Sequence, residues 1–374
     1  MVFCMALADV MRVAVHQFTP NLAIKAWLPG ETLFSLASRH HIVSCNCFSA
    51  DTCGQLFGPS STSPRHDLPC GIDFFVKTTN GQFGEAEEVI FERTLLPIYL
   101  PLNGDVLAKK AVIVLRGDRI GSLKYSLGTM LDHFHAYHPL KACELCMEDD
   151  IAREGVAYWH RMHQIPGVWY CPQHHCPLMI APVPGKVAAR YDWCLPRRDI
   201  LKRIGLASST SRDSSQADTL ERFAQAALAL TSLAPSMFLD RELLAQVYTD
   251  RLVSLGFRKK GGKLRSDCSA LVLKNSAPLR TRSDLSALPS TVDRASAYVS
   301  KLCWRPAVRM HTLLHLFTIV WLFNDWETFW SAAEPVSKKR AHGFSPDLNH
   351  VSYKERNASY RRQLAEIMEE ESRR

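Results

Sequence analysis

The chain has 374 residues, of which 47% are hydrophobic and 22% are charged, and its formal net charge is +8 at pH 7. This composition is ordinary for a globular protein that buries real cores, and a length of roughly 150 residues per domain predicts two or three domains. The sequence contains no apolar run of roughly 18 residues, which excludes a membrane-spanning helix. The first residues lack the basic start and the cleavage site of a signal peptide, so we expect a cytoplasmic protein.

The positive charge is concentrated in the second half of the chain. Between Lys186 and Arg309 there are 22 lysines and arginines against 11 aspartates and glutamates. A basic block of this size is typical of proteins that bind an anionic partner, most often a nucleic acid. The alternative interpretation is a solvated surface that keeps the protein in solution.

The first 140 residues predict a leader followed by a helical domain. Residues 1–26 are expected to be weakly ordered, and the domain is expected to span residues 27–140. Apolar residues at helical spacing, with Gly and Pro at the ends, predict its elements in chain order. These elements are helices over residues 31–41, 49–57 and 85–96, a short β-branched strand over 111–115, and a turn followed by a helix within 121–138.

The rest of the chain is predicted to form a cysteine-containing module, a basic helical domain and a charged tail. We place these parts at residues 141–181, 186–334 and 335–374, with a Pro- and Gly-containing boundary between the first two. The expected fold class is therefore mainly α-helical. Within the basic domain the pattern predicts helices over 219–233, 240–255 and 307–329, and a polar stretch with little helix over 266–290.

Two pairs of metal-ligating residues lie in the cysteine-containing module. Cys143 and Cys146 are separated by two residues, and after 24 further residues Cys171 and His174 have the same separation. Two tight turns of this kind aim four ligands at one tetrahedral ion, and sulfur with nitrogen suits Zn²⁺ better than Mg²⁺ or Ca²⁺. Because four protein ligands leave no position for water, we expect a structural zinc ion in a small zinc-knuckle module.

The neighbouring residues offer alternatives for this site. His175 and Cys176 are adjacent to His174 and can replace it as the fourth ligand, although only His174 repeats the two-residue spacing of the first pair. His160 and His163, between the two pairs, are interpreted as histidines that pack or hydrogen-bond within the module, with a second metal as the alternative.

Signals for an enzyme are weak. His133 and His135 alternate around an aromatic residue, as in the metal site of rolling-circle nucleases, but no acidic cluster accompanies them, so we interpret them as surface or packed histidines. The chain has no Gly-rich phosphate loop that ends in Lys-Ser or Lys-Thr, which argues against ATP hydrolysis. We therefore predict no catalytic residues.

The densest basic cluster follows the helix predicted at 240–255. Positive side chains on a flexible turn can contact phosphates, and such binding weakens as salt concentration rises. The alternative is a solvated loop. The predicted nucleic-acid-binding residues are Arg258, Lys259, Lys260, Lys263 and Arg265.

Taken together, short motifs make the chain resemble the TniQ/TnsD family of target-selection proteins from bacterial transposons. The resemblance covers about residues 27–180 and is strongest from Cys143 to Leu178, with a weaker landmark at Arg305-Pro306 and beyond. Two positions depart from the family pattern, which usually has Pro where this chain has Glu144 and Gly where it has His175. The other motifs that carry the resemblance are Leu28-Pro29-Gly30-Glu31-Thr32-Leu33, Leu56-Phe57-Gly58, His66-Asp67-Leu68-Pro69, Thr94-Leu95-Leu96-Pro97-Ile98-Tyr99, Tyr158, Arg161, His163-Gln164 and Pro166-Gly167-Val168.

The resemblance implies a mostly helical fold in which a helix-turn-helix-like unit precedes the zinc module. It implies a non-enzymatic protein that marks target DNA and recruits the transposon's AAA+ ATPase. Longer members of the family bind a DNA site directly, and shorter members dock on an RNA-guided CRISPR complex, often as homodimers. The rival interpretations are a zinc-containing DNA-binding transcription regulator and a metal-dependent nuclease.

Overall fold

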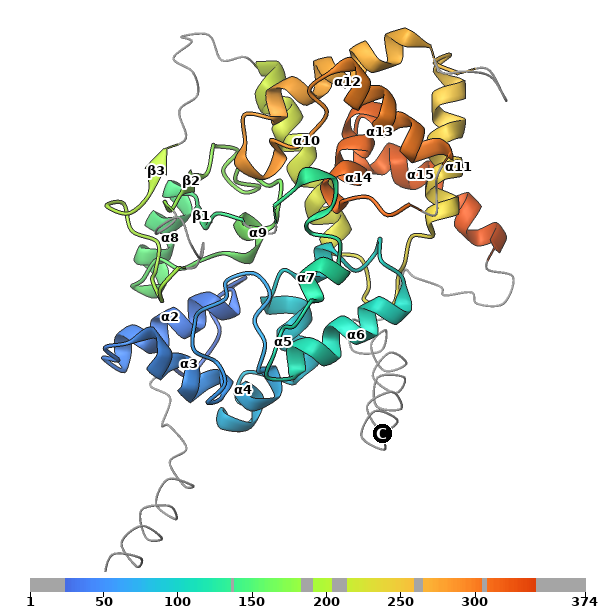
Figure 1. The fold of residues 1–374 in the computed structure, drawn as a ribbon. Helices are drawn as coiled ribbons and strands as arrows, with labels where there is room; N and C mark the ends of the chain where they lie inside the picture. The colour runs from blue at the N-terminus through green and yellow to red at the C-terminus, as the bar shows by residue number, and fades with distance from the viewer. Residues whose placement is uncertain are drawn as a thin grey trace, which may run out of the picture.

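The computed structural model describes residues 24–135, 138–182, 191–203, 214–258, 265–304 and 308–340. The predicted leader, apart from residues 24–26, and the tail beyond residue 340 lie outside these ranges. The described chain is mainly α-helical, as the sequence predicts, with one small sheet (Figure 1). Among the described residues, no helix has the length and apolar character needed to cross a bilayer.

The N-terminal part consists of short helices that precede the cysteine-containing module. Thr32 begins the first helix by accepting a hydrogen bond from the Ser35 amide at 3.1 Å, and Gly58, with φ of +93°, ends the second. The helices predicted at 31–41, 49–57 and 85–96 are confirmed within a few residues. The elements are α2 (Leu33–Val43), α3 (Ser49–Phe57), α4 (Ile72–Thr78), α5 (Ala86–Arg93), η1 (Leu96–Ile98), α6 (Asp105–Arg116), α7 (Leu123–Ser126) and η2 (Leu131–His133).

The strand predicted at 111–115 is wrong, because these residues form the second half of α6. The β-branched composition of the segment favoured a strand. However, Ala108, Ala111, Val112 and Leu115 are all fully buried, and their spacing of three and four residues lines one face of a helix. Packing of this face against the neighbouring helices outweighs the local β preference.

A three-stranded antiparallel sheet holds the ends of the cysteine-containing module together. Its strands are β1 (Lys141–Ala142), β2 (Met179–Ile180) and β3 (Lys202–Arg203), in the order β1-β2-β3. Helices α8 (Glu144–Glu154) and α9 (Arg161–Gln164) lie between the first two strands in the chain. Residues 202–203, which we expected in the basic domain, thus pair with the module that was predicted to end at residue 181.

The C-terminal part is a cluster of helices, shown in yellow-green to red in Figure 1. The helices predicted at 219–233 and 240–255 are confirmed, and Asp240 caps the second by accepting from the Leu243 amide at 2.9 Å. The elements are α10 (Ser214–Thr231), α11 (Arg241–Ser254), α12 (Ser266–Leu279), η3 (Ser283–Leu285), α13 (Val292–Trp304), α14 (Thr312–Thr318), η4 (Ile319–Phe323, a π-helical turn) and α15 (Trp326–Arg340).

Two predictions for this part are wrong. The stretch 266–290 was expected to contain little helix, yet α12 forms there because Cys268, Val272 and Leu279 are buried at helical spacing within a polar sequence. The single helix expected over 307–329 is instead divided between α14 and α15. Asn324, with φ of +77°, interrupts the chain, and Asp325 starts α15 by accepting from the Thr328 amide at 2.8 Å.

The C-terminal helices contact the earlier parts of the chain through polar groups that are buried or half-buried. Asp284 of η3 accepts hydrogen bonds from the Gly167 amide at 2.8 Å and from Trp169 Nε1 at 2.7 Å. Asp132 of η2 binds Lys301 Nζ at 2.5 Å and the His311 amide at 3.0 Å. Both carboxylates satisfy donors from a distant part of the sequence, so they fix the position of the C-terminal helices on the rest of the fold.

Candidate metal centre

The first ligand pair lies at the start of α8. Cys143 is the N-cap residue of this helix and Cys146 lies in its first turn, so both sulfurs are close to the helix N-terminus. The partial positive charge at this end favours thiolates over neutral thiols. Both side chains are almost completely buried, at 0% and 3% exposure.

The second pair lies on a tight turn between Tyr170 and Pro177, which form an isolated β-bridge. The Cys171 amide donates to the Cys176 carbonyl at 2.8 Å, and the His174 amide points at the Cys171 sulfur at 3.4 Å. This turn brings His174 back over the sulfur of Cys171. The structure therefore places the second pair on a reversal of the chain, as the sequence predicts, whereas the first pair belongs to a helix.

The four predicted ligands converge on one point. The ligand atoms of Cys143, Cys146, Cys171 and His174 all lie within 4.8 Å of one another. His174 Nδ1 is 3.6, 3.3 and 3.7 Å from the sulfurs of Cys143, Cys146 and Cys171, and the sulfurs of Cys146 and Cys171 are 3.6 Å apart. A tetrahedral zinc ion with Zn–S and Zn–N bonds of about 2.3 and 2.0 Å has ligand-to-ligand distances of about 3.5–3.8 Å, so the cluster fits such an ion.

The cysteine thiols influence one another's ionisation. Hydrogen bonds from the thiols of Cys146 and Cys171 lower the pKa of Cys143, whereas hydrogen bonds with Cys143 and Cys171 raise the pKa of Cys146. The neighbouring thiols therefore favour the thiolate form of Cys143 even without a bound cation. A divalent cation favours thiolates at the remaining cysteines as well.

An acidic side chain supports the histidine ligand. Asp149 Oδ2 lies 3.4 Å from His174 Nε2, the ring nitrogen that faces away from the sulfurs. A carboxylate in this position orients the ring and makes the ligating nitrogen more basic. Sequence reasoning did not assign this role to Asp149, although its place three residues after Cys146, on the same face of α8, is the signal that identifies it.

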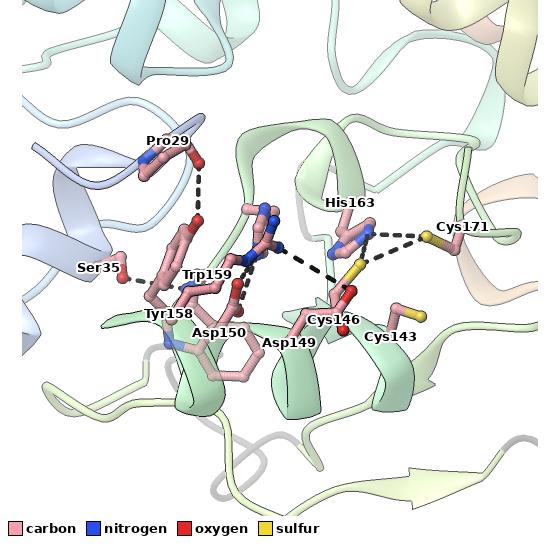
Figure 2. A network of polar contacts seen from close by, with 12 residues as sticks. Pro29, Ser35, Cys143, Cys146, Asp149, Asp150, Tyr158, Trp159, His163 and Cys171 are labelled. Carbon is pink, nitrogen blue, oxygen red and sulfur yellow. Dashed lines mark hydrogen bonds and ion pairs between the residues drawn. The ribbon is translucent and has the colours of Figure 1, made fainter. Parts of the chain in front are cut away.

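The N-terminal part is attached directly to the cysteine-containing module (Figure 2). Tyr158 Oη donates to the Pro29 carbonyl at 3.0 Å, and the Trp159 amide donates to Ser35 Oγ at 3.0 Å. The Thr32 amide donates to the Trp159 carbonyl at 3.1 Å. The turn that starts α2 is therefore anchored to the chain that connects the two ligand pairs.

The alternative ligands lie at different distances from the cluster. His175 is exposed and its ring faces Glu221, at 3.8 Å, so it does not join the cluster. His160 binds Asp150, with the shorter contact at 2.9 Å, and stacks on Tyr158. Cys176 lies closer, with its sulfur 3.4 Å from that of Cys143. His163 touches two of the ligand sulfurs, those of Cys146 and Cys171.

The histidine pair considered for a nuclease shows no metal-site geometry in the described part of the chain. His133 and His135 are both exposed, while Phe134 between them is buried and stacks on His311 with ring centroids 4.1 Å apart. Within the described ranges, the cluster around Cys143 is the group of side chains suited to a metal ion.

The predicted nucleic-acid-binding cluster is only partly described. Lys259, Lys260 and Lys263 lie outside the described residues. Arg265 is exposed and binds Asp267 at 2.7 Å, and its amide donates to the Phe257 carbonyl at 2.9 Å. This hydrogen bond holds together the two ends of the segment that connects α11 to α12. In Figure 1 this corner lies on the opposite side of the view from the sheet and α8.

Comparison with known proteins covers the segment that contains the four candidate metal ligands. Residues 25–178 match the model of the TniQ family. This segment is similar to a TniQ domain. The sequence is also similar to the transposition protein TnsD of transposon Tn7 from Escherichia coli, with 27% identity over 88 residues, which cover 24% of this chain and 17% of that relative. The TniQ/TnsD resemblance predicted from the motifs is confirmed.

The two departures from the TniQ pattern have structural explanations. Glu144 is the first residue of α8, a position that suits Pro because its amide has no partner and suits Glu because of the helix dipole. His175 has φ of +48°, a conformation that Gly adopts without cost and other residues adopt rarely. Neither change displaces a ligand of the cluster.

Proposed function

We propose that this chain is a non-enzymatic targeting protein of a bacterial DNA transposon, which binds target DNA or a targeting complex and recruits the transposon's AAA+ ATPase. The observation that carries the proposal is the TniQ match over residues 25–178, which includes all four ligands of the Cys₃His cluster. The similarity to TnsD, a transposition protein, supports the same class of role.

In this proposal the cluster holds a structural zinc ion. Four protein ligands fill a tetrahedral shell, so the ion stabilises the TniQ domain and has no position left for a substrate or a reactive water. Purified protein should contain one zinc ion per chain. Replacing Cys143 and Cys171 together with Ser should abolish metal binding and unfold the module, because two of its four ligands are lost. A protein without stoichiometric zinc that keeps its fold after these changes would contradict the assignment.

We propose that direct DNA contact comes from the segment between α11 and α12 and not from the α2–α3 pair. The helices α2 and α3 are joined by five residues, slightly more than the turn of about 3–4 residues in a helix-turn-helix unit, and between Leu33 and Phe57 they contain one Lys or Arg. That residue, Arg39, is bound to Glu31 at 2.6 Å. The α11–α12 segment has five cations within eight residues, and phosphate binding depends on such positive charge.

Salt-dependent DNA binding tests this assignment. Replacing Arg258 and Arg265 with Ala should weaken binding to all sequences and reduce the slope of log affinity against log salt by about 1 for each phosphate that is no longer bound. Lys110→Ala, an exposed cation of α6, is the matched control and should leave the slope unchanged. If the slope is the same in all variants, this segment is not the DNA-binding surface. That result would favour docking on an RNA-guided CRISPR complex.

Recruitment of the AAA+ ATPase distinguishes the proposed targeting protein from a transcription regulator or a nuclease. Immobilised full-length protein should retain the transposon's ATPase, whereas a zinc-containing transcription regulator should bind DNA and leave the ATPase in the flow-through. Replacing His133 and His135 with Ala should leave transposition intact, and its loss would support the nuclease. Molecular mass in solution, with and without the ATPase, tests the proposed homodimer.

A further inference from the structure

His163 lies against the metal centre but is not one of its four proposed ligands. Its Nε2 atom is 3.4 Å from the Cys171 sulfur and 3.8 Å from the Cys146 sulfur. Figure 2 shows the ring beside both sulfurs, with contacts drawn to each. The side chain is completely buried, at 0% exposure, so its polar atoms have no access to bulk water.

The surroundings of the ring decide where its proton lies. A neutral imidazole carries a single N–H, on either Nδ1 or Nε2. Nδ1 is buried without a hydrogen-bond partner among the described residues, whereas Nε2 faces two sulfurs. A buried N–H without an acceptor is costly, so the proton belongs on Nε2 and the sulfurs act as acceptors.

Sulfur is a good acceptor here only if it is ionised. A thiol sulfur accepts hydrogen bonds weakly, whereas a thiolate is a charged acceptor with a stronger bond. Three thiolates and one neutral histidine around a divalent ion leave a net charge of −1 in a buried site. The nearby buried cation, Lys141, donates to the carbonyls of Ile165 and Val168 and not to the sulfurs. The N–H of His163 therefore contacts this charge directly.

We infer that His163 is a positioning residue of the metal centre, which donates its Nε2–H to the sulfurs of Cys146 and Cys171. This hydrogen bonding holds both cysteines as thiolates in the geometry that the ion requires, and it slows loss of the metal. The inference rests on the metal content proposed above. His163, in the His163-Gln164 motif, therefore acts on the metal centre through the ligand sulfurs and does not bind the ion itself.

The NMR tautomer of His163 in the full-length, zinc-loaded protein tests the inference without any substitution. The ¹⁵N shifts should show a protonated Nε2 and an unprotonated Nδ1. In protein loaded with ¹¹³Cd²⁺, the Hε2 proton should show a coupling to the metal through the N–H···S bond. A ring protonated at Nδ1 would overturn the inference. A wild-type protein that binds no metal would overturn the proposed zinc site instead.

Substitutions measured in the Co²⁺-loaded protein supply the second test. His163→Leu should keep the visible bands of tetrahedral Co²⁺, because no ligand is lost, but should shift the sulfur-to-cobalt charge-transfer band to lower energy. It should also bind metal about 10–100-fold more weakly, the usual effect of removing an outer-shell partner, and release the metal to a chelator at a higher rate. His163→Gln, which keeps an N–H donor, should recover part of the rate, and the exposed His175→Gln should match the wild type.

Two outcomes would contradict this role of His163. Unchanged release rate and unchanged charge-transfer energy in His163→Leu would show that the N–H does not act on the sulfurs. Loss of the tetrahedral bands would make His163 a ligand. If His163→Leu does not fold, the ¹⁵N tautomer of the wild type still decides the question.

Discussion

Replacing Gly167 with Ala is expected to destabilise the protein, because the added methyl group would enter the contact between the turn at Gly167 and the C-terminal helices. Gly167 has φ of +84°, and a Cβ atom there would lie 2.2 Å from Cε1 and 2.8 Å from Cδ1 of Phe223. The Leu313 side chain would be 3.4 Å away. Phe223 is completely buried in α10, so its ring cannot move into solvent.

Two costs contribute to the expected change in the free energy of unfolding. A left-handed conformation costs an Ala about 1–2 kcal/mol relative to Gly. Forcing an extra methyl group into a packed core costs about 1–3 kcal/mol more. Gly155→Ala is the matched control, since Gly155 has φ of +74° but open space around the position of its Cβ. The control should show the first cost alone.

Urea unfolding of the zinc-loaded protein measures both variants. Gly167→Ala should be less stable than Gly155→Ala by about 1–3 kcal/mol. Adding Phe223→Leu to Gly167→Ala should recover part of that loss, because the smaller side chain removes the clash and the two changes are coupled. Equal stability of the two alanine variants would refute the packing of α10 on the turn at Gly167.

Two further substitutions test the buried polar contacts. Asp284→Asn should lower the unfolding free energy by about 1–3 kcal/mol, because an amide can accept from only one of the Gly167 and Trp169 donors; an unchanged melting temperature would show that these bonds are dispensable. Burial lowers the pKa of His311 to about 4, so between pH 6.5 and 4 the unfolded state binds the extra proton and stability falls as pH falls. His311→Asn keeps a capping side chain and should reduce this slope by up to about 1.4 kcal/mol per pH unit, and an unchanged slope would contradict the role given to His311.

Local signals account for most of what the sequence predicts correctly. The positions of Cys143, Cys146, Cys171 and His174 are recognisable because ligand spacing reflects how a short turn aims two side chains at one ion. The helices with a capping residue or a stop residue, such as Gly58 after α3, were also placed within a few residues. These features need no knowledge of the distant chain.

The features that sequence reasoning missed depend on distant contacts. The segment 111–115 is helical because the helix buries one apolar face. Helix α12 forms because its apolar side chains Cys268, Val272 and Leu279 are buried in the core. The contact of His163 with two cysteine sulfurs is invisible in spacing, since it arises from the fold of the connection between the ligand pairs. Burial of the whole side chain is the property that distinguishes His163 from the exposed His175.

The pairing of β3 with β2 has a practical consequence for dissecting this protein. The TniQ match ends at residue 178, just before β2, while the strand that completes the sheet lies at Lys202–Arg203. A fragment that stops at residue 181 would leave the backbone donors and acceptors of β2 open along one edge, and open edges favour aggregation. Recombinant fragments or chimaeras built around the segment that matches the TniQ model should therefore extend past Arg203.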